Sequence, residues 1–297
     1  MGCFGQADRG DSMFLDANGK IFFTATTDAF KEGYKYSHEM FKEGLIDPES
    51  YNMGDSELAA KLRDPADIVG CINNFAIADR VDTERLKDFA PVPYLTGPKG
   101  EYDCRENMSE MHNPVNFVIT KACKDPVLAA KYADGTYDPV KSVETNWGAL
   151  DYVYKMDDKG QMVWSDYKDG FDNFDDMRAV SVLAVRHPLA IFNDYYGKVV
   201  EYPINAQYLL DTMKAVGFVD KHLNDSYIPP LWYGTEDAAR LAILQTQVYE
   251  NVLDPTRRGW IIDGGVDEGW DRYLSDLKAA GLDEMISIVQ KTYDSTK

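Results

Sequence analysis

Residues 19–50 read GKIFFTATTDAFKEGYKYSHEMFKEGLIDPES and predict a short strand directly before an amphipathic helix. The strand is KIFFTA, residues 20–25, whose apolar and aromatic side chains favour extended backbone. From Asp28 apolar residues recur at helical spacing, and Gly44 stands where a left-handed C-cap would end the helix. We expect Leu45 to make the hydrophobic contact of that cap. A strand followed by a helix is typical of α/β proteins.

Two further segments predict strands of the same kind. Residues 66–72, ADIVGCI, have a buried-strand pattern and run into a polar and aromatic loop. Residues 116–120, NFVIT, predict another strand, and Asp125 caps a following helix that has Pro126 at its first position. Loops that follow strands are where α/β proteins place ligand contacts.

The C-terminal third is predicted to be helical. A helix runs from an N-cap at Thr235 to about Val252, a second from Asp267 to Gly281, and Asp283 caps a last one. Earlier, residues 147–202 are aromatic and acidic with poor periodicity, which predicts irregular structure with exposed rings.

Length and charge restrict the class of protein. The 297 residues suffice for two compact units or one large one. No run approaches the roughly 18 uninterrupted apolar residues of a membrane span. Fifty acidic residues against 31 basic ones give a net charge of −19, which repels phosphate backbones and excludes nucleic acid as the expected partner.

No metal or cofactor motif is present in the sequence. The four cysteines form no CxxC pair and the four histidines no HExxH pattern, and there is no GxSxG, Walker or GxGxxG motif. The cysteines are Cys3, Cys71, Cys104 and Cys123. The turn from Asp16 to Gly19 resembles the start of an EF-hand loop, but its glycine comes two positions early and Thr27 stands where glutamate is needed. We therefore expect no metal and no cofactor.

The order of several segments carries a resemblance that none of them carries alone. Residues 19–50 are followed by DIVGCINNF, FAPVPYLTGPKG and FVITKACKDPVLAAKYADGTYD, and the chain ends with GWDRYLSDLKAAGLDEMISIVQKTYD. In that order they resemble the extracellular solute-binding proteins of carbohydrate ABC importers, which are often lipoproteins. The EGLIDPE segment, the tryptophan of GWDRYL and the closing QKTYD are the most characteristic features.

The resemblance implies an α/β, periplasmic-binding-protein-like two-lobe fold of type II, incomplete at the N-terminus. Residues 1–111 would form part of the second lobe, 112–200 part of the first, and 201–297 helices returning to the second. Family members carry a signal sequence, a lipid-bearing cysteine and roughly half of the fold ahead of the KIFFTA strand. This chain is therefore expected to match the family's C-terminal portion, without a signal, and the full-length protein to be lipid-anchored on the extracellular face of the membrane.

The function that follows from the resemblance is binding of an oligosaccharide by hinge closure, without catalysis. The expected partners are the sugar and the membrane subunits of an ABC importer, and the protein is expected to be a monomer. Sugar sites combine flat rings for stacking with amides or carboxylates for hydroxyl groups. The side chains of that kind chosen here are Asn73, Asn74, Phe75, Trp147, Asn193, Asp194, Tyr195 and Tyr196.

Three alternatives stay open at this stage. Each chosen residue could simply pack or cap a turn, because aromatic side chains are common in cores. A carbohydrate-active hydrolase needs only two suitably placed carboxylates, and nothing in the sequence singles out a pair. A truncated interaction domain without a transport role is the third.

Overall fold

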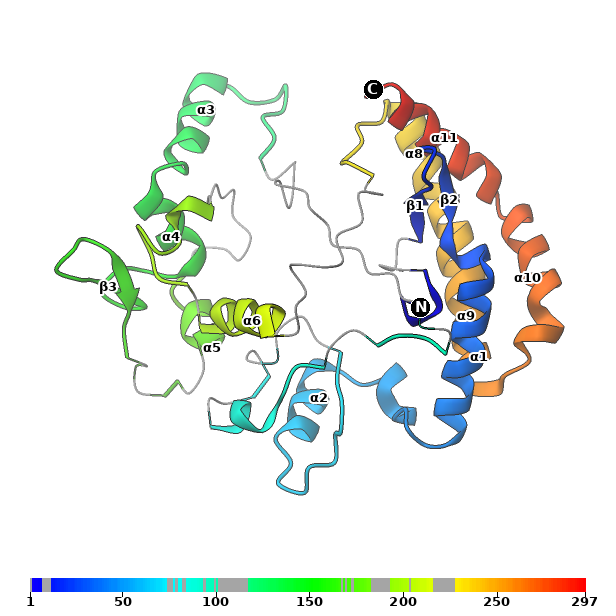
Figure 1. Cartoon of the computed structure of the whole chain (residues 1–297). Coiled ribbons are helices and arrows are strands. Elements are labelled where there is room, and N and C mark those ends of the chain that lie inside the picture. The colour runs from blue at the N-terminus through cyan, green and yellow to red at the C-terminus, as the bar shows by residue number, and fades with distance from the viewer. Residues whose placement is uncertain are drawn as a thin grey trace. The chain divides into compact units, whose positions relative to one another are not determined.

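The computed structural model describes two compact units (Figure 1). The described residues are 2–6, 12–73, 77, 80–81, 84–92, 95–98, 100, 117–166, 168, 170–171, 174–182, 193–202, 204–215 and 228–297. Unit 1 comprises Met1–Met53, Val92–Glu110 and Gly217–Lys297, and unit 2 comprises Gly54–Pro91 and Met111–Val216. Both units are assembled from separate segments, so the chain passes between them more than once. The expected lobe boundaries at 111 and 200 stay a prediction.

Unit 1 begins with the hairpin and helix predicted from residues 19–50. Strand β1 (Met13–Leu15) pairs antiparallel with β2 (Ile21–Phe23), and helix α1 (Asp28–Lys42) follows. The Thr27 hydroxyl accepts a hydrogen bond from the Phe30 N–H and caps the helix. Gly44 has the predicted left-handed backbone, with φ of 75°, but the Leu45 side chain is exposed, so the expected hydrophobic cap contact is wrong.

Helices form the C-terminal part of unit 1, and the first of them extends further than predicted. They are α8 (Thr235–Gln245), a π-helical segment (Thr246–Leu253), α9 (Asp254–Asp263), α10 (Val266–Ala279) and α11 (Leu282–Asp294). Pro255 lies in the first turn of α9 and lacks an N–H, and the widened π segment precedes it. The helix therefore continues past the expected end near Val252.

Glycines, not the predicted polar residues, precede two of these helices. Gly234 is the N-cap of α8 in place of Thr235, and left-handed Gly281 is the N-cap of α11 in place of Asp283. A Cβ at Gly281 would lie 2.5 Å from Leu244 Cδ2. Close packing between α8 and α11 therefore determines where this helix begins.

The core of unit 1 lies between the hairpin and these helices. Helix α1 packs on α9 and α10, where Trp260 stacks on Trp270 with ring centroids 5.6 Å apart. Helix α11 is tied to β2 by Gln290, whose Oε1 accepts from the Ile21 N–H over 2.7 Å. Elements far apart in the sequence thus close one core.

Unit 2 combines short helices with one two-stranded hairpin. The helices are α2 (Asp55–Leu62), α3 (Pro126–Gly135), α4 (Pro139–Trp147), α5 (Phe174–Ala179) and α6 (Ile204–Ala215). Strand β3 (Tyr154–Met156) pairs antiparallel with β4 (Met162–Trp164). The buried residues of one hydrophobic core cluster in unit 2 are Val143, Val153, Tyr154, Met162, Met177 and Val200. As predicted, Asp125 caps α3 by accepting from the Leu128 N–H over 2.9 Å.

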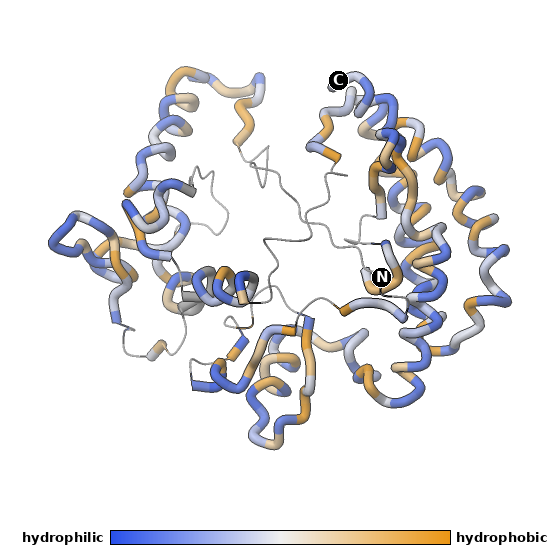
Figure 2. The backbone as a smooth tube through the Cα atoms, viewed as in Figure 1, coloured by the Kyte–Doolittle hydropathy of each residue, from blue (hydrophilic) through white to orange (hydrophobic). Residues whose placement is uncertain are grey.

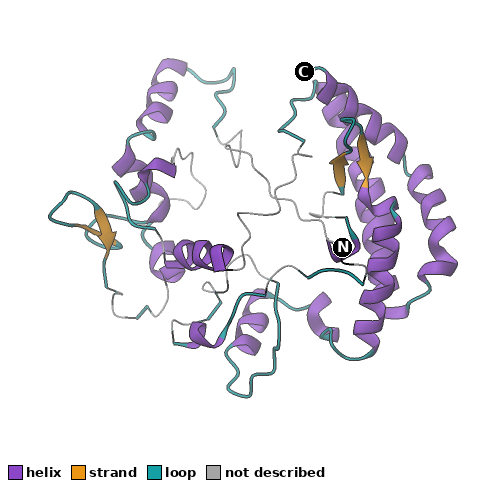
Figure 3. Cartoon of the chain, viewed as in Figure 1, coloured by secondary structure: helices purple, strands orange, loops and turns teal. Residues whose placement is uncertain are grey.

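Two predicted strands do not form in the described part of unit 2. Figure 3 shows strands only in the two hairpins. Residues 66–72 are bent by a turn in which Asp64 Oδ1 accepts from the Ala66 N–H over 2.8 Å and Asp67 has φ of 53°. Residues 117–120 form no regular secondary structure and are exposed. A strand requires a pairing partner as well as apolar side chains, and these segments have none among the described residues.

No helix in the described ranges is long and apolar enough to cross a membrane.

Candidate functional site

Unit 2 gathers five aromatic side chains, here called the aromatic cluster. Its members are Trp147, Tyr154, Trp164, Tyr196 and Tyr202. They come from the end of α4, from both strands of the hairpin, and from residues 196–202. This last segment lies beside β4, because the Met162 N–H donates to Val199 O over 2.7 Å and the Glu201 N–H to Met162 O over 2.9 Å.

Trp147 is positioned by the residue that follows it. Helix α4 ends at Gly148, whose φ of 121° lies outside the range that other residues readily adopt. A Cβ there would overlap Val153 and lie 2.8 Å from Ser181 Oγ. Only glycine fits, and the turn leaves the Trp147 indole facing Tyr196, to whose hydroxyl oxygen Nε1–H donates over 3.1 Å.

The Arg178 guanidinium lies over the face of the Trp147 ring. Its guanidinium carbon lies 4.5 Å from the ring centroid, a cation–π contact. The same side chain donates from Nε to Asn146 O over 2.7 Å and from Nη2 to Asn146 Oδ1 over 3.1 Å. Helix α5 thereby holds the last turn of α4, and the planar guanidinium keeps a defined orientation.

The partly exposed edge of the cluster is Tyr202. Its ring stacks on Tyr196 with centroids 4.9 Å apart and planes at 13°. The Tyr202 carbonyl accepts from Trp164 Nε1–H over 2.8 Å, which fixes the backbone that carries the ring. With 37% of its surface exposed, Tyr202 presents an aromatic face supported from behind by a second ring.

Tyr154 is the most deeply buried member of the cluster. It is fully buried against Trp164, with ring centroids 4.5 Å apart, and its hydroxyl has no hydrogen-bond partner in the described part of the chain. Burial raises the pKa of the Tyr154 phenol well above its ordinary value. Burial also raises the pKa of Tyr196, against the opposing effect of the Trp147 hydrogen bond. Both phenols are therefore neutral at physiological pH.

The structure brings together two of the eight residues chosen from the sequence, Trp147 and Tyr196. Tyr195 donates its hydroxyl to Tyr137 O over 3.1 Å, and Asp194 is exposed and lies 3.5 Å from Lys198. Asn193 begins the short turn Asn193–Tyr195.

The other three chosen residues are Asn73, Asn74 and Phe75. Asn73 is exposed, and no described contact joins it to the cluster. Asn74 and Phe75 lie outside the described residues. The exposed rings expected over residues 147–202 are partly wrong, because Tyr154 is fully buried and the other rings of the cluster pack on one another.

Sequence reasoning missed four members of this arrangement, namely Tyr154, Trp164, Tyr202 and Arg178. Tyr202 stood at the boundary of the aromatic stretch, and its neighbourhood of aromatic residues was a usable signal. Arg178 carried no signal, because a single arginine in a short helix is ordinary in sequence. Only the fold places it over Trp147.

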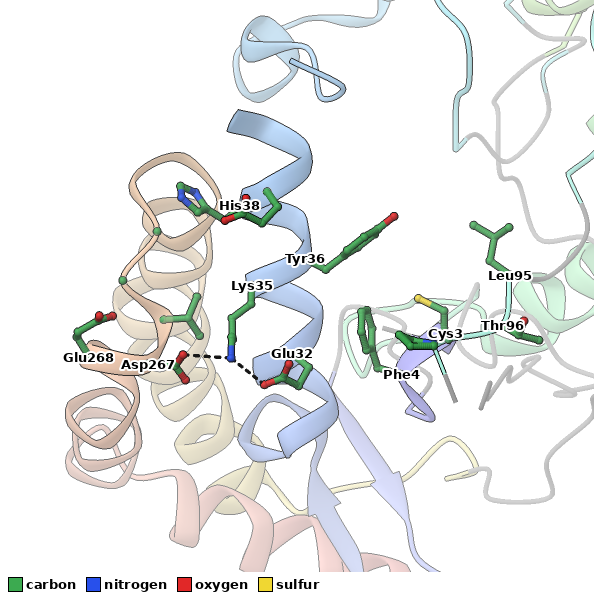
Figure 4. Close-up of a pocket in the computed structure, with 16 residues that line it drawn as sticks. Cys3, Phe4, Glu32, Lys35, Tyr36, His38, Leu95, Thr96, Asp267 and Glu268 are labelled. Carbon is green, nitrogen blue, oxygen red and sulfur yellow. Dashed lines mark hydrogen bonds and ion pairs between the residues drawn. The ribbon is translucent and has the colours of Figure 1, made fainter. Parts of the chain in front are cut away.

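Unit 1 contains a second candidate, a pocket of about 710 Å³ around α1. Figure 4 shows Phe4, Cys3 and Leu95 on one side of the helix and Asp267 and Glu268 on the other. Within it, Lys35 Nζ lies 3.1 Å from both Glu32 and Asp267, so its charge is already compensated. Because its lining residues lie on opposite sides of one helix and the Lys35 charge is already paired, this pocket is the weaker candidate.

No group of three metal-ligating side chains is found among the residues that the structure describes. In the turn that resembles an EF-hand, Asp16 Oδ1 accepts from the N–H groups of Asn18 and Lys20, each over 2.8 Å. This carboxylate oxygen therefore stabilises the turn itself.

Comparison with known proteins identifies the fold. No family model matches the chain. The fructooligosaccharide ABC transporter substrate-binding protein FusA of Streptococcus pneumoniae is 28% identical over an alignment of 302 positions, which covers 98% of this chain and 53% of FusA. A solved structure of FusA with kestose has a TM-score of 0.74 at 26% identity, over 99% of this chain and 59% of that one.

A more distant structure agrees on the fold. A solute-binding protein from Bifidobacterium longum infantis, described as binding human milk oligosaccharides (HMO), has a TM-score of 0.72 at 20% identity, over 95% of this chain and 57% of that one. The chain is thus similar to FusA, an ABC transporter substrate-binding protein, and spans about half of that relative's length. The expected periplasmic-binding-protein-like fold is confirmed.

Proposed function

We propose that this chain forms the C-terminal portion of a substrate-binding protein for an ABC importer and that its ligand is an oligosaccharide. The similarity to FusA, which is named for fructooligosaccharides and has been solved with kestose, supports this ligand class. The second partner that we propose is the set of membrane subunits of the importer. We also propose a monomer on the extracellular face, lipid-anchored in the full-length protein, that closes about a hinge on its ligand.

The observation that carries the binding site is the supported ring of Tyr202. A sugar ring has an apolar face of C–H groups, which stacks on an aromatic ring, and a rim of hydroxyls. Tyr202 is partly exposed and is braced by Tyr196, which is in turn hydrogen-bonded to Trp147. A ring held in this way loses little conformational freedom when a ligand binds, and this favours affinity.

A polar group beside the Tyr202 ring is suited to hydrogen-bond sugar hydroxyls. Glu201 Oε2 accepts from the Trp164 N–H over 3.2 Å, which leaves its carboxylate with further acceptor capacity beside Tyr202. We include Asn73, Asn74 and Phe75 in the proposal as residues of the same unit, with Phe75 as a second stacking ring.

The test is calorimetric titration of the chain with kestose and nystose. We expect Tyr202→Ala to weaken binding at least about tenfold, which corresponds to roughly 1.4 kcal/mol. Tyr36→Ala is the matched control, because that tyrosine is 55% exposed and lines the pocket of unit 1. Loss of affinity in Tyr36→Ala with none in Tyr202→Ala would place the ligand in unit 1 and refute the site proposed here.

The same titrations separate binding from the two alternative functions. A hydrolase would release reducing sugar from kestose during the experiment, and neutralising one carboxylate would abolish the release. An interaction domain without a sugar ligand would give no heat with any oligosaccharide tested. Phe75→Ala and Tyr195→Ala complete the set, because unchanged affinity in both variants would remove these residues from the site.

A further inference from the structure

Glu201 places a negative charge one residue before Tyr202, on a segment that β4 holds in place. Its backbone N–H donates to Met162 O over 2.9 Å, and its Oε2 accepts from the Trp164 N–H over 3.2 Å. The Tyr202 carbonyl accepts from the indole N–H of the same tryptophan over 2.8 Å. Strand β4 therefore fixes both the carboxylate and the backbone that carries the partly exposed ring.

The Glu201 carboxylate has no cation paired with it among the described residues. Its one described hydrogen-bond donor is the neutral N–H of Trp164, whereas an ionised carboxylate can accept about four hydrogen bonds. The cation of the aromatic cluster, Arg178, lies over Trp147 and donates to Asn146. Glu201 therefore keeps acceptor capacity together with an uncompensated charge.

The charge of Glu201 acts within the aromatic cluster. Burial raises the pKa of the Tyr154 phenol most, and the Tyr196 phenol and the Glu201 carboxylate add to the rise, against the opposing effect of Arg178. The negative charge thus affects a buried ring, where water screens it less than at an open surface. Tyr202 belongs to the same cluster through its stack on Tyr196, so a charged ligand on its ring would interact with the same carboxylate.

We propose that Glu201 determines the charge specificity of the sugar site, accepting hydrogen bonds from hydroxyls of a neutral oligosaccharide and repelling oligosaccharides that carry carboxylate groups. The two oxygens of a carboxylate match a pair of adjacent hydroxyls, and hydrogen bonds to an ionised acceptor are roughly twice as strong as neutral ones. This inference rests on the proposed oligosaccharide site and adds the residue that selects which sugars it binds.

The experiment compares two ligands that differ by one charge. They are kestose and kestose oxidised to a carboxylate at one primary hydroxyl, each titrated calorimetrically into the full chain. Because two like charges about 6 Å apart near a protein surface repel each other, we expect kestose to bind at least about tenfold more tightly than the carboxylate. Salt screens this repulsion, so raising NaCl from about 20 to about 500 mM should reduce the ratio of the two affinities.

Glu201→Gln keeps an oxygen that can accept from the Trp164 N–H but removes the charge. In this variant the affinity ratio should fall to about threefold or less, and it should no longer depend on salt. Kestose itself should bind about three- to tenfold more weakly, because its hydrogen bonds to the site lose their ionised acceptor. A purely structural role for Glu201 would weaken both ligands equally and leave the ratio unchanged.

Asp158→Asn is the matched control. Asp158 is exposed at the tip of the β3–β4 hairpin, which Figure 2 shows as hydrophilic, and the substitution removes one negative charge from the same unit. It should leave the affinity ratio unaltered, which separates a local effect of Glu201 from the net charge of −19. An equal change of the ratio in both variants would overturn the assignment.

The outcomes distinguish this inference from the proposed function. If kestose binds but the ratio is the same in the parent chain and in Glu201→Gln, Glu201 is not the specificity residue and the proposed sugar site stands. A carboxylate that binds the parent chain as tightly as kestose leads to the same conclusion. Absence of heat with kestose in the parent chain would refute the proposed ligand, and this inference with it.

Discussion

Trp147 Nε1–H donates a hydrogen bond to the Tyr196 hydroxyl oxygen over 3.1 Å, although 49 positions separate them in the sequence. This bond joins the end of α4 to the segment that carries Tyr202, the ring on which we propose that the sugar stacks. Its strength determines how firmly the two parts of the aromatic cluster are connected.

Removal of the indole donor should destabilise the chain and weaken sugar binding. We expect Trp147→Phe to lower the free energy of unfolding by about 1 kcal/mol, the usual net contribution of one such bond. Tyr196→Phe should cost a similar amount, and the double variant little more than either. Urea denaturation monitored by circular dichroism provides the three values, with Trp232→Phe, at an exposed tryptophan of unit 1, as the control. Additive losses would show that the hydrogen bond contributes nothing.

The unpaired hydroxyl of Tyr154 predicts a stabilising substitution. Tyr154→Phe removes a buried oxygen that has no partner among the described residues, so stability at pH 7 should be unchanged or rise by about 1 kcal/mol. Thermal denaturation measures this directly. A loss above 1 kcal/mol would indicate that the hydroxyl is satisfied, for example by a bound water molecule.

The same substitution should alter the alkaline stability of the protein. Because the pKa of Tyr154 is raised in the folded state, its contribution is complete below the unfolded value of about 10 and is lost as pH rises above it. The decline between pH 10 and 11 should therefore be shallower in Tyr154→Phe than in the parent chain. Urea denaturation of both proteins at each pH measures the two slopes, and identical slopes would contradict the prediction.

Gly148 should not tolerate a side chain. Gly148→Ala adds a Cβ that overlaps Val153 at a φ of 121°, and we expect a loss of roughly 2–4 kcal/mol. Gly160→Ala is the matched control, with φ of 80° but open space around its Cβ, and should cost only about 1 kcal/mol. Equal losses in the two variants would mean that backbone conformation alone, and not crowding, accounts for the effect.

Gln290 is expected to hold the hairpin of unit 1 to α11. Its Oε1 accepts from the Ile21 N–H over 2.7 Å and its Nε2 donates to Gly19 O over 3.3 Å. Gln290→Ala should cost about 1–2 kcal/mol because it leaves a part-buried N–H without a partner. Gln290→Glu keeps the acceptor and should recover part of this loss. Chemical denaturation distinguishes them, and an unchanged Gln290→Ala variant would contradict the assignment.

Local signals were sufficient wherever the structure depends on neighbours in the sequence. The strand within residues 20–25, the helix from Asp28 and the Asp125 cap follow from side-chain periodicity and from capping over three residues. The strands expected at 66–72 and 116–120 were wrong in the described residues, because pairing depends on a second segment that composition does not reveal.

The candidate site shows the same limit. Trp147 and Tyr196 were chosen as aromatic residues in a polar neighbourhood, yet nothing in the sequence indicated their contact. Arg178 and Tyr202 were missed because a cation over a ring and a stack of two rings are relations in space.

The sequence by itself determined the acidic character of the chain, the helices α1, α3, α8, α10 and α11, and the resemblance to solute-binding proteins. These properties depend on composition, on periodicity along one helix and on the order of segments. The tertiary structure alone decided that five aromatic rings form one cluster behind Tyr202 and that α3 exposes Val127 and Leu128. The physical reason is that burial and ring contacts depend on which distant segments meet, and a linear pattern records only which residues are able to be buried.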